Sequence, residues 1–276
     1  MRTRLFLEML LASAVFLVFE VRAEADDWSR EWYAEVTASS YMFSLGSVRA
    51  DHAVWMLEGD AVQHLSGFGH VLLGYWALSD LEKKHDSGHR SSVYESDPYL
   101  FYGYDFDFAE GWRLRNRLGL IWVCNEGYDE KVEHLIREWT YAGELKSPCA
   151  TLFGQVRVVD GRGTFVRCGL KRVIEVAGGM FSIVPHVAMS GGSTRWNRCR
   201  YGDYDGKPRL SGGMGTVDYG ISVLVPLGWG ASFYVDIFGY DAVDHDTRVQ
   251  IRESRRHGMT RRTDAFVAMS GVRWEF

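Results

Sequence analysis

The sequence lacks a long apolar run beyond its first 25 residues. The best later candidate, residues 213–240, is interrupted by Asp218, Pro226 and Asp236. A helix needs roughly 20 mostly apolar residues to span the hydrocarbon core of a bilayer. This absence argues against a helical membrane protein.

Cysteine is scarce, and basic residues are not in excess. The chain has 4 cysteines and a formal net charge of −5. Without a net basic field, a nucleic-acid partner is not expected. The cysteines are widely spaced and form no C-x-x-C pair, which does not favour a disulfide framework, although a bridge between Cys124 and Cys199 stays open. We expect neither a cofactor nor a metal site, because the scattered histidines of residues 79–92 are a weak signal.

What is present at the amino terminus is a targeting pattern. Arg2 and Arg4 precede an apolar stretch from Leu5 to Phe19, and small residues follow up to Ala25. This layout predicts a signal peptide over residues 1–25, with an uncleaved anchor as the alternative. The remaining residues, 26–276, are expected to form one exported domain.

The dominant pattern after residue 25 is an alternation of apolar and polar residues. In residues 214–227, Val217, Tyr219 and Ile221 share one parity, and Asp218 and Ser222 share the other. Period two predicts strands with unlike faces. Twelve such stretches occur: 31–44, 53–64, 68–78, 93–108, 112–124, 134–146, 150–159, 163–176, 180–191, 214–227, 230–241 and 263–276. The nearest approach to a helical pattern is residues 129–139.

The connections between these stretches alternate in length. Those at 65–67, 109–111, 147–148, 177–179 and 228–229 are short, and those at 79–92, 125–133, 192–213 and 242–262 are long and polar. Short turns at one end and long loops at the other are typical of outer-membrane barrels. The sequence therefore predicts an all-β fold, a closed antiparallel transmembrane barrel of about twelve strands, with a soluble β-sandwich as the alternative.

The chain ends on FVAMSGVRWEF, in which Phe266, Val272, Trp274 and Phe276 share one face. This segment resembles the carboxy-terminal strand of Gram-negative outer-membrane barrel proteins. The resemblance implies a location in the cell outer membrane, and it implies that these residues belong to the sorting signal read by the barrel-assembly machinery. Ser39 and Tyr41 also resemble the Ser-x-Tyr first strand of an uncharacterised family of exported barrels.

The polar parity of the predicted strands suggests a charged lumen. A tight turn at 109–111 sets Asp107 opposite Arg113 and Asp105 opposite Arg115, and opposite charges across a strand pair stabilise it. Further charges of the same inward parity extend this network: Arg117, Glu138, Arg157, Arg167, Lys171, Asp218 and Asp236. We expect a narrow porin or channel for small polar solutes, with anions as the candidate class, rather than an enzyme.

Two alternatives remain. A non-conducting surface barrel could act through a basic outer loop that contacts outer-membrane lipid and lipopolysaccharide; this loop carries Arg252, Arg255, Arg256, Arg261 and Arg262. A rim-site lipid hydrolase could use His186 and Ser190, which share the inward parity of one strand.

Some residues fit the barrel pattern poorly. Pro185 lies within a predicted strand and would call for a bulge. Arg137 and Arg172 fall on the lipid-facing parity near strand ends, where long side chains can reach the interface. Asn116 has the same parity in mid-strand and has no explanation from the sequence.

Overall fold

The computed structural model describes residues 30–40, 42–44, 47–50, 53–65, 67–80, 93–125, 135–256 and 262–275. The predicted signal peptide, Tyr41, Arg261 and Phe276 lie outside this part of the chain. None of the helices in the described ranges is long and apolar enough to cross a bilayer.

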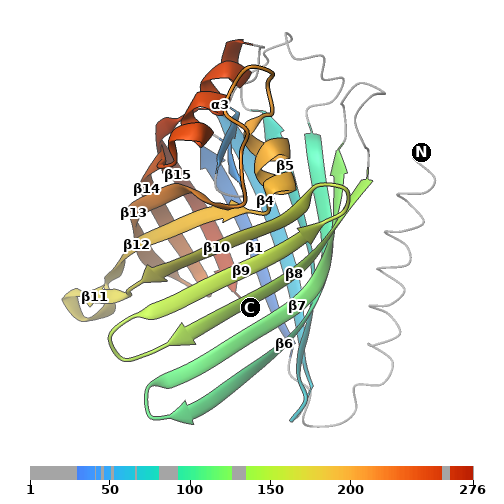
Figure 1. Cartoon of the computed structure of the whole chain (residues 1–276). Helices are drawn as coiled ribbons and strands as arrows, with labels where there is room; N and C mark the ends of the chain where they lie inside the picture. Colours follow the sequence, from blue (N-terminus) through green and yellow to red (C-terminus); the bar gives the residue numbers. More distant parts are fainter. Residues whose placement is uncertain are drawn as a thin grey trace.

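Twelve antiparallel strands close into a barrel (Figure 1). They are β1 (Arg30–Ser39), β4 (Val54–Leu65), β5 (Gly69–Asp80), β6 (Val93–Ala109), β7 (Trp112–Asn125), β8 (Leu135–Lys146), β9 (Thr151–Val159), β10 (Gly163–Lys171), β12 (Phe181–Gly192), β13 (Gly213–Gly228), β14 (Ala231–Ala242) and β15 (Asp264–Glu275). The first strand, β1, pairs with both β4 and the last strand, β15, and β10 pairs with β12. The sheet therefore has no free edge along its wall, as a strand structure in lipid requires.

The strand predictions are confirmed in type and order, with two corrections. The stretch predicted as 31–44 is not one strand, because β1 ends at Ser39 and the separate hairpin of β2 (Met42–Ser44) and β3 (Ser47–Ala50) follows. The stretch predicted as 163–176 divides into β10 and the short β11 (Ile174–Val176).

Pro185 explains why the predicted strand 163–176 is divided into β10 and β11. The register of β12 against β10 and against β11 is the same, so the predicted bulge is absent. Arg172 still donates its backbone N–H to the Pro185 carbonyl oxygen at 3.1 Å. Proline has no N–H to return to Arg172, and the ladder is interrupted at this point.

Two helices occupy connections that the sequence predicts as polar loops. They are α2 (Thr194–Tyr201) and α3 (His245–Arg256). Both lie at the end of the barrel opposite the turns β6–β7 and β8–β9 (Figure 1). We call the end with the tight turns the short-turn end, and the other the long-connection end. The short 3-10 helix η2 (Ala177–Gly179) forms the turn before β12.

Helix α3 was predicted as a polar loop because its buried side is mostly polar: Thr247, Gln250 and Ser254 accompany Ile251. A helix signal depends on apolar residues at a spacing of three and four, and here only one is apolar. Residues 129–139 were the nearest approach to a helical pattern, but their described part belongs to β8, as the strand prediction for 134–146 expects.

The outward face of the barrel is apolar and exposed. On β6 and β7 it carries Phe106, Phe108 and Trp112. The Phe106 and Phe108 rings stack at a centroid distance of 6.1 Å, and the Trp112 ring is tilted against Phe108 at 6.0 Å. Leu118, at mid-strand, is 56 % exposed. An exposed apolar wall around a closed barrel suits a lipid environment.

The outward polar residues have neighbours that satisfy them. Asn116 stays in the predicted register, and Tyr141 on β8 donates its hydroxyl to the Asn116 side-chain oxygen at 2.7 Å. Arg137 lies 3.5 Å from Asp160 at the long-connection end. The disulfide alternative is not realised, since Cys124 and Cys199 are not bridged to each other.

Candidate functional site in the barrel interior

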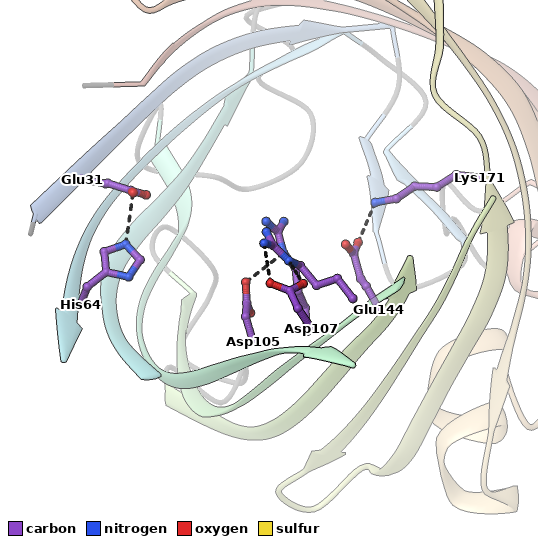
Figure 2. Close-up of polar contacts among 8 residues, drawn as sticks. Glu31, His64, Asp105, Asp107, Glu144 and Lys171 are labelled. Carbon is purple, nitrogen blue, oxygen red and sulfur yellow. Dashed lines mark hydrogen bonds and ion pairs between the residues drawn. The ribbon is translucent and has the colours of Figure 1, made fainter. Parts of the chain in front are cut away.

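The predicted cross-strand ion pairs are present at the short-turn half of the interior. Arg113 Nε lies 2.6 Å from Asp107 Oδ1, and Arg115 Nε lies 3.1 Å from Asp105 Oδ2. The strand register sets each pair directly opposite. Figure 2 shows the side chains of Asp105 and Asp107 pointing into the space enclosed by the strands, as do those of Glu31 on β1 and His64 on β4, which lie 3.2 Å apart.

Other pairs of the predicted network join strands that are not neighbours. Lys171 on β10 reaches over β9 to Glu144 on β8 at 2.6 Å (Figure 2). Arg167 on β10 reaches over β12 to Asp218 on β13 at 2.7 Å. Each bridge crosses a strand whose facing residues are small or lie flat. The network therefore ties the wall together around its circumference, rather than only along each hairpin.

The Phe153 ring supports two of these cations. A Cβ on Gly169 would meet this ring at 2.5 Å, so the glycine leaves room for the ring to lie flat on β10. The Arg167 guanidinium carbon and Lys171 Nζ lie 5.5 and 5.7 Å from the ring centroid. The aromatic face holds both cations close to the wall.

Burial of the network increases away from the short-turn end. Arg157 Nη1 binds Glu138 Oε2 at 2.9 Å, and the Glu138 side chain is only 6 % exposed. The Asp218 side chain is 2 % exposed. Asp105 and Asp107, by contrast, are exposed. Water therefore reaches the inner wall from the short-turn end and is progressively excluded deeper in the barrel.

Two residues of the predicted network make no ion pair within the described ranges. Asp236 accepts a hydrogen bond from the Ser222 hydroxyl at 3.0 Å instead. Arg117 is exposed although its strand parity points it inward, opposite Gly103 on β6. Its guanidinium group is available to a solute that enters the lumen.

The interior charges separate into two sectors. The inward positions of β7, β9 and β10 carry basic but no acidic residues: Arg113, Arg115, Arg117, Arg157, Arg167 and Lys171. Those of β1, β4 and β6 carry acidic but no basic residues apart from histidine: Glu31, Glu35, Glu58, Asp60, Glu95, Asp97, Asp105 and Asp107. The two sectors adjoin at the β6–β7 strand pair. Strand β8 lies within the basic sector but carries the inward Glu138 and Glu144, which pair with Arg157 and Lys171. Arg117 on β7 is the cation of the basic sector that no carboxylate pairs at ion-pair distance within the described ranges.

Tyrosines inside the barrel organise the acidic sector, and the sequence reasoning missed them. Tyr99 on β6 donates its hydroxyl to Glu58 at 2.8 Å and also contacts Asp60, both on β4. Gly74 on the intervening strand β5 makes this reach feasible, because a Cβ there would meet the Tyr99 ring at 2.3 Å. The sequence signal that could have predicted this contact is an inward tyrosine beside an inward glycine on the next strand.

A polar cluster around Glu35 connects the first and last strands, and we call this junction of β1 and β15 the seam. Glu35 on β1 accepts from Arg273 on β15 at 3.0 and 3.1 Å and from Tyr234 on β14 at 2.6 Å. Tyr33 also donates to Glu35, and the Arg273 guanidinium carbon lies 5.4 Å from the Tyr33 ring centroid. This cluster joins the two ends of the sheet.

Toward the long-connection end the interior is packed and apolar, which the sequence analysis did not predict. Trp196 of α2 is 3 % exposed, and its ring packs at a tilt against Phe165 of β10 at a centroid distance of 5.4 Å. It joins a cluster of inward side chains: Leu72, Tyr99, Ile121, Val123, Ile136 and Val159. A Cβ on Gly192 would meet the Trp196 ring at 2.6 Å, so this glycine admits the indole.

A recess of about 70 Å³ lies beside the ion pairs at the short-turn end. It is lined by Arg113, Arg115, Glu144, Lys146 and Thr151. Three of these five residues are basic, so the recess continues the basic sector.

The candidate hydrolase pair is not assembled. The Ser190 hydroxyl oxygen has no hydrogen-bond partner among the described residues, and the His186 ring packs against Phe238 at a centroid distance of 6.2 Å. Within the described ranges no group of three or more His, Cys, Asp and Glu side chains is placed to hold a metal ion.

The predicted sorting residues lie on the outward face of β15. Phe266 is 75 % exposed, and Val272 and Trp274 share its parity. The predicted basic loop is in large part helix: Arg252, Arg255 and Arg256 belong to α3, and Arg262 precedes β15.

No protein-family model matches the sequence, and no curated protein matches it. Solved structures share its barrel architecture. The KdgM porin in complex with disordered oligogalacturonate has a TM-score of 0.47 and 8% identity, over 89% of this chain and 99% of that chain.

Two other similar structures are those of proteins from Escherichia coli and Salmonella typhimurium. Outer membrane phospholipase A from Escherichia coli has a TM-score of 0.46 and 11% identity, over 88% of this chain and 92% of that chain. LpxR from Salmonella typhimurium has a TM-score of 0.43 and 6% identity, over 88% and 99%. Scores and identities this low support no inference about function.

Proposed function

We propose that the protein is an outer-membrane barrel whose lumen passes small polar solutes, with anions favoured along its basic sector. The observation that carries this proposal is the exposed, inward-facing Arg117, which has no ion pair within the described ranges. A guanidinium group facing water inside a closed barrel can bind and release an anion, whereas a purely structural charge is normally paired.

The two faces of the wall support the proposed outer-membrane location. Backbone groups in lipid must be satisfied internally, and a closed antiparallel barrel does so. Its outward side chains are apolar and its inward side chains are polar over the short-turn half. In outer-membrane barrels the short turns face the periplasm, so the water-filled half of the lumen would open on that side.

The arginines of β7 supply selectivity in this proposal. An anion entering from the short-turn end passes Arg113, Arg115 and Arg117 in succession, and of these Arg117 has no carboxylate at ion-pair distance within the described ranges. Passage is limited at the layer of Phe165 and Trp196, where the interior is packed. Barrels of intermediate strand number fall between those that side chains fill and those that leave a wide channel.

Single-channel recording in planar bilayers tests the proposal. The refolded protein is expected to give discrete conductance steps with a preference for chloride over potassium. Arg117→Glu removes the free cation and adds an anion, so the chloride-to-potassium permeability ratio is expected to fall at least threefold. Trp196→Ala is expected to raise the conductance of each step.

Arg172→Glu is the matched control, since Arg172 is exposed outside the lumen at the short-turn end. It should leave the permeability ratio unchanged. Silence over many insertions of the wild-type protein and of Trp196→Ala would contradict the channel proposal. An unchanged permeability ratio in Arg117→Glu would contradict the role of the basic sector.

A further inference from the structure

Helix α3 presents a row of arginines along one flank. Arg248, Arg252 and Arg255 are spaced by four and three residues, which places them on the same side of a helix. All three are exposed. We call this set the arginine flank. Basic residues are predicted here from the sequence, but these three arginines share one side only because the segment is a helix.

Contacts on the other side of α3 fix the orientation of this flank. Ile251 is buried with Tyr201, Leu210 and Ala242. Gln250 donates its side-chain amide to the Pro208 carbonyl oxygen at 2.7 Å and accepts from the backbone N–H of Tyr204 at 3.2 Å. The helix is therefore held on the barrel mouth from one side only.

The charge of the arginine flank is not neutralised within the described ranges. Arg252 and Arg255 have no carboxylate at ion-pair distance there, and Arg248 Nε donates to the Ala242 carbonyl oxygen. The nearby Glu253 is already engaged by Lys207 at 3.3 Å and by Arg256 at 2.9 Å. Partial desolvation would raise the pKa of Glu253, but these two cations outweigh it and lower that pKa, so the carboxylate stays ionised and paired.

The position of α3 brings the arginine flank to the rim of the lipid-facing wall. The helix contacts β14 and stands at the long-connection end (Figure 1). Val243 and Phe266, at the same end of β14 and β15, expose apolar side chains. Cations above an exposed apolar rim match an amphiphile with anionic headgroups and apolar chains.

We propose that the arginine flank binds the phosphate groups of lipopolysaccharide in the outer leaflet. Arginine forms bidentate, charge-assisted hydrogen bonds with phosphate. Lipopolysaccharide carries phosphates at the height of the membrane interface, and the apolar rim residues meet its acyl chains. This inference rests on the proposed outer-membrane location, but it does not require the lumen to conduct.

Binding of lipopolysaccharide to the purified, detergent-solubilised full-length protein tests the inference. Arg252→Gln/Arg255→Gln removes both unpaired cations while keeping the helix-forming side-chain type, and it is expected to weaken binding at least tenfold. Dephosphorylated lipopolysaccharide is expected to bind the wild-type protein as weakly as the intact molecule binds the double variant. Arg252→Lys/Arg255→Lys keeps the charge and should recover part of the affinity.

Arg172→Gln, at the short-turn end, is the control and should bind like wild type. Equal binding by the double variant and wild type would overturn the inference, and so would indifference to phosphate removal. Insertion into phospholipid vesicles free of lipopolysaccharide is measured in parallel. Failure to insert would contradict the membrane location itself, whereas insertion with unaltered lipopolysaccharide binding in the double variant would contradict only the arginine flank.

Discussion

Replacing Glu35 by leucine is expected to lower the free energy of unfolding by about 3 kcal/mol, the lower end of the range for breaking a buried ion pair. The Glu35 side chain is 13 % exposed and accepts from Arg273, Tyr234, Thr37 and Tyr33. The substitution leaves a guanidinium group and three hydroxyls without their common acceptor. Arg273 is one-third exposed, so water offsets part of the cost. Urea unfolding of the protein in lipid vesicles, followed by the gel shift of the unheated barrel, measures the change.

Glu31→Leu is the matched control on the same face of β1. Glu31 is 65 % exposed and pairs only with His64 within the described ranges, so its loss should cost less than about 1 kcal/mol. Glu35→Leu/Arg273→Leu removes both charges and should be less destabilising than Glu35→Leu alone. If Glu35→Leu behaved like Glu31→Leu, the seam would not depend on this cluster.

Replacing Leu118 by arginine is expected to destabilise the barrel by about 2–4 kcal/mol, the cost of an arginine on the lipid face near the bilayer midplane. Leu118 lies at the middle of β7 and points outward. On a water-exposed surface the same change would be nearly neutral, because Leu118 is already 56 % exposed and makes few contacts. Urea unfolding in lipid vesicles therefore reports whether this face contacts lipid.

Two further variants separate charge from the loss of the leucine. Leu118→Ala tests the loss of apolar surface alone and should cost less than the arginine. Glu110→Arg places an arginine in the β6–β7 turn, outside the apolar band, and should change stability by less than about 0.5 kcal/mol although its change in net charge is larger. A Leu118→Arg barrel as stable as the wild type would contradict the lipid-facing assignment.

The sequence predicted the wall of the barrel well because a strand has a period of two. Once the alternation was recognised, each residue was assigned to a face, and Asp107 and Asp105 were matched with Arg113 and Arg115. Both pairs are observed, although the turn is tighter than expected: β6 extends to Ala109, which pairs with Trp112 after a register shift. Local pairs follow from register and need no knowledge of the rest of the fold.

Contacts between strands that are not neighbours could not be predicted from the sequence. Arg167 and Asp218 are 51 residues apart and lie on strands that are not neighbours, so only the closed barrel brings them together. The apolar layer was missed for a related reason. Trp196 lies in a connection between strands, and its place against Phe165 depends on a helix whose sequence is mostly polar.

The two-faced wall is tested most directly by a nitroxide scan along β7 in lipid vesicles. The four native cysteines are first replaced by alanine, and single cysteines at positions 113–118 then carry the spin label. Labels at 113, 115 and 117 are expected to collide preferentially with a water-soluble nickel complex, and those at 114, 116 and 118 with oxygen dissolved in lipid. Equal access of the nickel complex to all six positions would contradict a barrel that encloses water and faces lipid.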